Sequence, residues 1–329
     1  MAHPAVSSLK PQLWLCFSLQ SGAYKHESCA CFRDTGEQCG VVARLEAVVY
    51  LDGEYLPRSQ AKVSVLDRGF LFGDGVYEVI PVFGGRPLRL PEHLDRLQRS
   101  MDRVSLHNPL MRSQWQSIFD ALLDKNPGDD RAIYLQVTRG VAPIRDLSVG
   151  AGTRPTVFAM VNEIRQADYA GLQAGISAIK VEDFRWKACD IKSISLIANV
   201  MIRLRANQSE VVDAILVRDG LVTEATASNV FVVNRGIIST PTKSEHLLAG
   251  ITRDLVIELA RANGLTVEER DIDENELETA DEIWLTSSTR EIAPVVRLDD
   301  RVVGHGVAGE YWKKMVTIYS HYKRELGNA

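Results

Sequence analysis

Residues 186–200, WKACDIKSISLIANV, place one lysine, Lys192, at the front of a mostly apolar run that we expect to enter a helix. A lysine ammonium is strongly hydrated, so burying it without a partner is unfavourable. Two interpretations are open: the side chain reaches solvent from a loop, or it is partly desolvated and its amine serves as a nucleophile. Because most lysines lie at the surface, the flanking sequence has to decide between them.

Strands and helices are mixed on both sides of this stretch. Before it, AVVYLDGEYLP (47–57) predicts a strand with an Asp-Gly turn, and GDGVYEVIPVFGGRPLRL (73–90) predicts a hairpin, followed by a helix with Pro91 at its front. After it, residues 213–240 predict a strand meander. The polar segment RQADYAGLQAG, 165–175, is typical of a linker.

The order of these elements predicts the fold class. Strands and helices do not alternate strictly, so we expect an α+β protein with two mixed domains. The N-terminal domain is expected over residues 46–164, the linker over 165–175 and the C-terminal domain over 176–329.

The first 45 residues differ from this body. They show no sustained hydrophobic period, and we expect a loosely ordered extension, or translated sequence upstream of the true start. A secretory signal is a weaker alternative because no small-residue cleavage site stands out. A metal site from His26, Cys29, Cys31 and Cys39 is weaker still because their spacing is unusual for zinc, so we expect no metal.

The composition excludes several classes of function. The chain has 329 residues, 45% hydrophobic and 25% charged, with a net charge of -5. Charges of both signs are scattered, which argues against a nucleic-acid partner, and no apolar run reaches the length of a membrane span. Only one of the five cysteines, Cys189, lies beyond residue 45, which suits a reducing, cytoplasmic location.

Several segments are suited to binding a phosphate. Gly250, Ile251 and Thr252 begin a predicted helix, where free backbone N–H groups and the helix dipole favour anions. The stretch TSSTRE, 286–291, offers hydroxyl groups after a strand, and Arg96 lies in an amphipathic helix. Each feature alone has an ordinary structural explanation, but together they describe a phosphate site.

A carboxylate completes the set. Glu224 closes LVTEATASN at a predicted strand end, and a carboxylate beside a heterocyclic nitrogen keeps that nitrogen protonated. An amine nucleophile, a phosphate site and such a carboxylate are the three requirements of pyridoxal 5'-phosphate. Together they favour the interpretation of Lys192 as a nucleophile.

From about residue 47 to its end, the chain resembles the class IV, fold-type IV pyridoxal-phosphate aminotransferases, and it looks most like their D-amino-acid transaminase branch. The resemblance rests on an ordered series of motifs: DRGFLFGDGVYEV, EHLDRL, QVTRG, RWKACDIKS, VTEATASN, GITRD and TSSTRE. It implies a fold-type IV structure, a homodimer, and transfer of an amino group from a D-amino acid such as D-alanine to a 2-oxo acid such as 2-oxoglutarate.

The resemblance also implies roles for individual residues. Lys192 matches the lysine that forms the Schiff base with the cofactor and carries the 1,3-proton shift, and Glu224 matches the partner of the pyridine nitrogen. Tyr77 matches a tyrosine on the substrate side. The remaining cofactor contacts, mostly to the phosphate, are matched by Arg96, Ser228, Ile251, Thr252, Ser288 and Thr289.

One motif departs from the family pattern. Many D-amino-acid transaminases carry an Arg-x-His carboxylate trap after TRG, supplied by the partner subunit, but here Ile144 and Asp146 stand at those positions. Arg145 lies between them and is our candidate for binding the substrate. The departure leaves other functions open: a branched-chain L-amino-acid aminotransferase, an aminodeoxychorismate lyase, an (R)-amine transaminase, or a non-catalytic protein that binds the cofactor.

Overall fold

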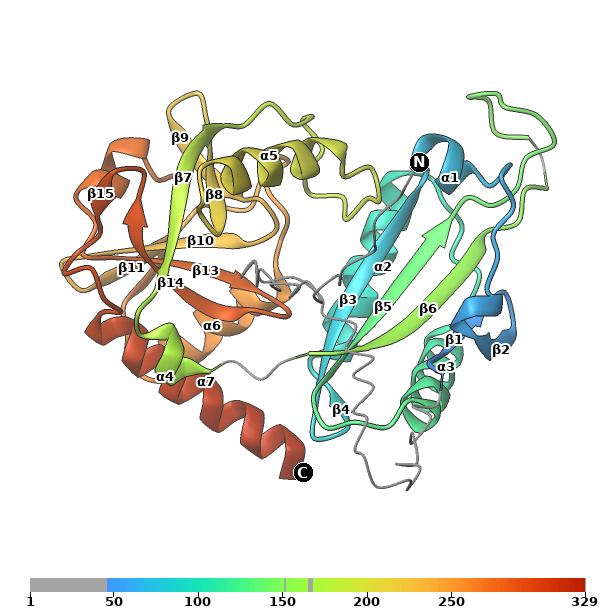
Figure 1. The fold of residues 1–329 in the computed structure, drawn as a ribbon, viewed down its shortest axis with the longest axis horizontal. Helices are drawn as coiled ribbons and strands as arrows, with labels where there is room; N and C mark the ends of the chain where they lie inside the picture. The colour runs from blue at the N-terminus through green and yellow to red at the C-terminus, as the bar shows by residue number, and fades with distance from the viewer. Residues whose placement is uncertain (1–45, 151, 165–167, 329) are drawn as a thin grey trace, which may run out of the picture. The chain divides into compact units, whose positions relative to one another are not determined.

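Two β-sheets organise the computed structural model, which describes residues 46–150, 152–164 and 168–328 (Figure 1). The expectation for residues 1–45 lies outside the described residues. Both sheets are combined with helices, which confirms the predicted α+β class. The first sheet is entirely antiparallel. Its strands follow the order β2 (Glu54–Pro57), β1 (Val48–Leu51), β6 (Thr156–Glu163), β5 (Arg131–Thr138), β3 (Gly75–Phe83) and β4 (Arg86–Pro87).

Local sequence explains the first hairpin. Asp52 and Gly53 both have positive φ angles, 48° and 103°, so they form the tight turn that joins β1 to β2. Asparagine, aspartate and glycine tolerate this conformation best, which is why an Asp-Gly pair between two strands predicts a hairpin. The prediction for residues 47–57 is confirmed.

Strand β3 separates its side chains between two faces. Val76, Glu78 and Ile80 are fully buried, whereas Tyr77 and Val79 on the opposite face are partly exposed. The buried face packs against two helices, α2 (Leu90–Arg103) and α3 (Arg112–Lys125). The carboxylate of Glu78 is therefore placed in an apolar core and requires partners there.

Helix α2 supplies those partners. The helix is amphipathic, as predicted: Leu94, Leu97 and Met101 face inward, and Pro91 lies in its first turn. The same inward face carries Arg96, which is only 4% exposed. A charged side chain on this face is unusual unless it is paired.

The second sheet is mixed and has nine strands. Strand β15 (Arg301–Val302) pairs with β14 outside the main order, and β7 runs parallel to both β14 and β8. The main order is β12 (Val267–Glu269), β11 (Ile237–Thr240), β10 (Asn229–Asn234), β13 (Glu282–Ser287), β14 (Glu291–Leu298), β7 (Ile176–Glu182), β8 (Asp213–Arg218) and β9 (Leu221–Ala225).

The predicted meander over residues 213–240 is wrong at its centre. β8 pairs with β9 and β10 pairs with β11, but β13, β14, β7 and β8 lie between β10 and β9 in the strand order. The chain turns sharply there, where the Ala225 N–H donates to the Ser228 oxygen over 2.7 Å. Strand β10 then pairs with β13, a partner that is distant in sequence. The corner between β9 and β10 is thereby free to line a cavity.

Short and long helices complete the fold. A core that includes Trp284, Trp312 and Phe231 lies where the second sheet meets helices α6 and α7.

The expected linker 165–175 contains α4, but residues 45–329 group as one compact unit, so the two-domain division stays a prediction. The remaining elements are η1 (Arg58–Gln60), α1 (Arg68–Phe72), α4 (Tyr169–Leu172), α5 (Ile197–Gln208), α6 (Ile251–Ala262), η2 (Glu274–Glu278) and α7 (Glu310–Asn328).

Candidate active site

Lys192 is held by its backbone against the first sheet. Its N–H donates to the Ser100 hydroxyl over 3.1 Å, and its carbonyl accepts from the Tyr77 N–H over 2.9 Å. Ser193 forms a bridge with Val76. The segment before α5 is thus pinned alongside the start of β3, far away in sequence.

The lysine side chain points over an aromatic ring. Its Nζ lies 4.2 Å from the centroid of the Tyr77 ring, and the residue is half-buried. Among the described residues no carboxylate pairs with this amine. A half-buried amine without a counter-ion remains free to react with a bound molecule.

The cavity beside Lys192 has a volume of about 330 Å³, within the usual range of small-molecule sites. Its walls come from β3 and α2, from the segment before α5 and α5 itself, from the β9–β10 corner, and from the starts of α6 and of the β13–β14 turn. Of the residues to which the resemblance assigns a role, those lining it are Tyr77, Arg96, Lys192, Glu224, Ser228, Thr252 and Ser288.

Arg96 enters the cavity from a fixed position. Its Nε and one terminal nitrogen, Nη2, each donate to a Glu78 oxygen over 2.8 Å, and Nη1 donates to the Ala249 carbonyl over 3.0 Å. His93 contacts the same carboxylate through Nδ1 at 2.8 Å. Burial alone would raise the pKa of Glu78, but Arg96 and His93 hold this pKa well below its usual range.

The start of helix α6 lies next to this arginine. Gly250 caps the helix, and a Cβ atom at this position would lie only 2.0 Å from the Asn229 Oδ1. The close approach requires glycine. Gly250 itself lines the cavity, so the helix begins at the cavity edge, where the N–H groups of its first turn have no partners within the helix. Thr252 lines the cavity, whereas Ile251 is buried and is not among its lining residues.

The end of β13 and the loop after it supply hydroxyl groups. Thr286, Ser287 and Ser288 line the cavity, and the buried Thr286 Oγ1 has no hydrogen-bond partner among the described residues. A buried hydroxyl without a partner is costly and points to a bound acceptor. Thr289 is instead turned to a separate hollow that it shares with Arg290.

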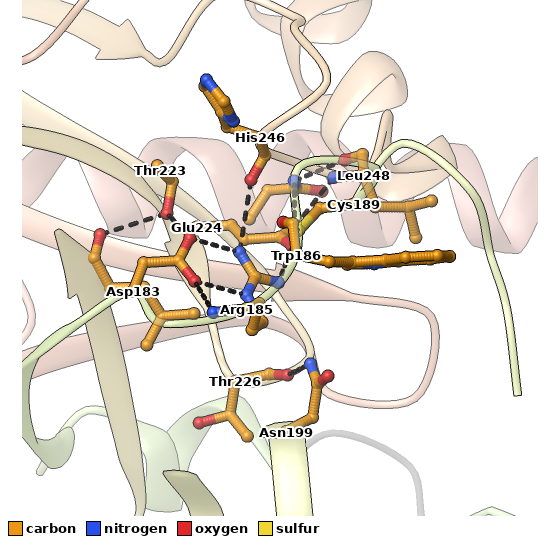
Figure 2. Close-up of polar contacts among 12 residues, drawn as sticks. Asp183, Arg185, Trp186, Cys189, Asn199, Thr223, Glu224, Thr226, His246 and Leu248 are labelled. Carbon is orange, nitrogen blue, oxygen red and sulfur yellow. Dashed lines mark hydrogen bonds and ion pairs between the residues drawn. The ribbon is translucent and has the colours of Figure 1, made fainter. Parts of the chain in front are cut away.

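Glu224 lies among hydrogen-bond donors (Figure 2). It is 5% exposed, contacts Arg185, and accepts from the Leu248 N–H over 3.1 Å and from Asn229 Nδ2 over 3.5 Å. Burial raises the pKa of this carboxyl, and the Arg185 guanidinium opposes that rise. The sequence did not single out Arg185, although it opens the motif RWKACDIKS, because nothing local indicates its partner.

The structure does not bring Arg145 into the cavity. Its guanidinium lies 5.0 Å from the Phe72 ring centroid, in a loop that Arg68 holds through backbone oxygens of Asp146, Leu147 and Ser148. The residue predicted to bind the substrate is therefore outside the site formed by this chain.

The donor set fits a phosphorylated pyridine. The cavity is lined by a guanidinium, a helix N-terminus and hydroxyls, which suit a phosphate, and by a carboxylate, which suits a ring nitrogen. The free amine of Lys192 lines the same cavity. The described ranges contain no group of three or more His, Cys, Asp or Glu side chains suited to a metal ion.

Comparison with known proteins gives a consistent result. Residues 75–298 match the family described as amino-transferase class IV. The chain belongs to the class IV aminotransferases. Pyridoxal 5'-phosphate is the cofactor of this class, so the predictions of a pyridoxal-phosphate-dependent aminotransferase and of its cofactor are confirmed.

Individual class IV relatives cover most of the chain. The chain is 41% identical over 269 residues to a D-alanine aminotransferase of Bacillus licheniformis. The matched residues make up 82% of this chain and 94% of that protein. The resemblance to the D-amino-acid branch is thereby confirmed.

Solved structures of the class share the fold. A branched-chain aminotransferase of Thermoproteus uzoniensis with norvaline is 26% identical, with a TM-score of 0.76 over 85% of this chain and 95% of that one. A branched-chain amino acid aminotransferase from Escherichia coli is 22% identical, with a TM-score of 0.75 over 84% and 93% of the two chains, and shows the fold alone. No helix of the described residues is long and apolar enough to cross a membrane.

Proposed function

We propose that this class IV aminotransferase moves the amino group of a D-amino acid, such as D-alanine, to a 2-oxo acid such as 2-oxoglutarate. The observation that carries the proposal is the unpaired Lys192 amine in a cavity that is also lined by a guanidinium, a helix N-terminus and a buried carboxylate. The D-handedness is supported by the 41% identity to a D-alanine aminotransferase.

The roles of the chain's own residues follow from this arrangement. When bound, pyridoxal 5'-phosphate supplies an aldehyde that condenses with amines and a ring that withdraws electrons from the α-carbon of the amino acid. Lys192 is assigned as the amine that holds the cofactor and as the base that takes the α-proton. Glu224 is assigned to the ring nitrogen, whose proton its negative charge stabilises.

The phosphate is assigned to the other side of the cavity. Arg96 supplies a positive charge, and the α6 N-terminus with Thr252 supplies N–H and hydroxyl donors. Ser288 and the unpartnered Thr286 hydroxyl add two further donors. The backbone N–H of Ile251 is assigned to the phosphate, and Ser228 is assigned as a neighbour of the cofactor. Thr289 keeps its predicted role as a cofactor contact, although it lines a separate hollow.

Recognition of the substrate carboxylate requires a further cation. Arg96, Arg185 and Arg203 line the cavity, but each is already paired with a buried carboxylate. Apart from Lys192, the described lining residues therefore offer no free positive charge. Tyr77 lines the cavity beside the lysine, and we assign it to the substrate side.

A homodimer supplies the missing charge in our proposal. Large apolar side chains are exposed on α1, on the loop around Arg145 and on α5, including Phe70 (73%), Leu147 (78%) and Ile197 (72%). A second copy that covers them would bring its Arg145 toward the cavity. Sedimentation velocity should give a dimer, and Arg145→Ala should raise the KM for D-alanine while leaving the KM for an (R)-amine unchanged. A monomeric active enzyme would contradict this part.

A donor panel tests the reaction itself. Purified holoenzyme with 2-oxoglutarate should produce pyruvate from D-alanine faster than it converts L-leucine or (R)-1-phenylethylamine. Faster turnover of L-leucine supports the branched-chain alternative, and faster turnover of the amine supports the amine transaminase. Pyruvate release from aminodeoxychorismate supports the lyase, and no turnover of any donor supports a non-catalytic protein.

Matched lysine variants test the catalytic assignment. Lys192→Ala should abolish transamination, whereas Lys187→Ala, five residues earlier and exposed, should retain it. Equal activity of the two variants would remove Lys192 from the mechanism.

We also propose a cytoplasmic location. The support is Cys189, a buried free thiol and the one cysteine of the described residues. Fractionation of cells that express the full chain should recover the activity in the cytosol, and recovery in a secreted or membrane fraction would contradict this.

A further inference from the structure

Glu224 ends a row of alternating charges that also contains Arg185 and Asp183 (Figure 2). Asp183, at the end of β7, pairs with Arg185, and Arg185 contacts Glu224. Asp183 and Glu224 are 6% and 5% exposed, and Arg185 is 8% exposed. Charges removed from water this completely are stable only when they are paired.

The guanidinium of Arg185 is fixed by all its nitrogens. Nε and Nη2 donate to the two Asp183 oxygens, each over 2.8 Å, and Nη2 also donates to the His246 carbonyl over 3.2 Å. The remaining terminal nitrogen, Nη1, faces Glu224. The planar fork therefore has one orientation, and it presents a positive charge to one side of the Glu224 carboxylate.

The other groups around Glu224 do not replace this charge. The Leu248 N–H and the Asn229 amide donate hydrogen bonds to Glu224 without carrying a charge. Of the ionisable neighbours, Asp183 is negative, and burial raises the pKa of the Cys189 thiol to about 11, which keeps the thiol neutral. Arg185 is the cation in direct contact with the carboxylate.

The ionisation of Glu224 decides what the carboxylate can do. Burial disfavours its charged form, and a neutral carboxyl group cannot balance a protonated ring nitrogen. An opposite charge in contact typically lowers a carboxyl pKa by about one to three units. The contact with Arg185 therefore opposes the effect of burial.

We propose that Arg185 is a positioning residue, oriented by Asp183, that keeps Glu224 ionised and directed at the cavity so that the ring nitrogen of the bound cofactor stays protonated. This inference rests on the proposed function, because it takes the Glu224 assignment as given. Arg185 acts through Glu224 and needs no contact with the substrate.

The test measures the ring nitrogen directly. Holoenzymes are prepared with pyridoxal 5'-phosphate labelled with ¹⁵N in its ring, and the ¹⁵N chemical shift is followed as a function of pH. The wild-type ring nitrogen should be protonated across neutral pH. In Arg185→Met, the pH at which half of it is protonated should fall by about one unit or more. Arg185→Lys should retain most of the protonation.

The matched control lies in the same cluster. Arg218 also pairs with Asp183, at 3.1 Å, and is similarly buried, but it does not contact Glu224. Arg218→Met should therefore shift the midpoint by much less than Arg185→Met. Equal shifts in the two variants, or a wild-type midpoint in Arg185→Met, would overturn the inference.

A variant of Glu224 separates this inference from the proposed function. If Glu224→Gln lowers the midpoint and Arg185→Met does not, the role of Arg185 is wrong and the role of Glu224 stands. If Glu224→Gln leaves the midpoint unchanged, the assignment of Glu224 itself fails. Should Arg185→Met not fold, Arg185→Gln takes its place, with the same expected shift and the same contradicting result.

Discussion

Glu78 offers a sharp test of how Arg96 is held at the cavity. The side chain is fully buried, and its carboxylate receives two hydrogen bonds from Arg96 and contacts His93, all at 2.8 Å. Glu78→Gln keeps the shape of the side chain but removes the charge. Arg96, which is 4% exposed, then becomes a buried cation without a counter-ion.

The expected loss is large. Removing one partner of a buried ion pair typically costs about 3 to 5 kcal/mol. At roughly 2 to 4 °C per kcal/mol, the midpoint of thermal unfolding of the cofactor-free protein should fall by about 6 to 20 °C. Bound cofactor should recover part of this loss, because its phosphate would offer Arg96 another negative charge.

The assay compares melting curves of cofactor-free and cofactor-loaded proteins. The matched control is Glu310→Gln, at an exposed carboxylate that pairs with Lys313, and it should leave the midpoint unchanged. The low pKa of Glu78 means that its contribution is present above the ordinary carboxyl pKa of 4.5 and is lost only in stronger acid. Equal melting temperatures for Glu78→Gln and wild type near neutral pH would refute the reasoning.

Three further outcomes are expected. His93 is buried, and burial lowers its pKa. As the pH decreases below about 6.5, the unfolded chain takes up a proton before the folded one, so the free energy of unfolding should decrease. In a urea-denaturation series over pH, His93→Asn should remove that decrease. Gly250→Ala should lose about 1 to 3 kcal/mol and bind the cofactor less tightly in equilibrium dialysis, because its Cβ meets Asn229. Cys189 should resist iodoacetamide in the folded protein near neutral pH, as peptide mapping would detect, and rapid alkylation would contradict its burial.

Local patterns predicted the elements that form the site's walls. The hairpin over residues 73–90 and the amphipathic helix that carries Arg96 depend on residues close in sequence, and the structure confirms both. The helix start at Gly250 was likewise visible from neighbouring residues.

Contacts between distant segments were not predictable in the same way. Nothing near Lys192 indicates that its backbone pairs with Tyr77, and nothing near Arg185 indicates that it contacts Glu224. The position of β13 beside β10 is also a long-range pairing, which is why the meander was wrong.

The hydroxyl loop shows a smaller limit. Four consecutive hydroxyl residues, 286–289, give no local signal for which side chains face inward. Thr286 and Ser287, the last two residues of β13, and Ser288 directly after it line the cavity, whereas Thr289 lines a separate hollow. Within a strand, successive side chains face opposite sides of the sheet, but the geometry of the turn at the strand end determines where this alternation of side chains stops.

The central claim is that the Lys192 amine holds the cofactor covalently. Treating the holoenzyme with borohydride, digesting it and mapping the peptides by mass spectrometry tests this most directly. The account predicts a phosphopyridoxyl group on Lys192, in the peptide that contains DIKS. Attachment to a different lysine, or no attachment to a protein that has bound the cofactor, would contradict it.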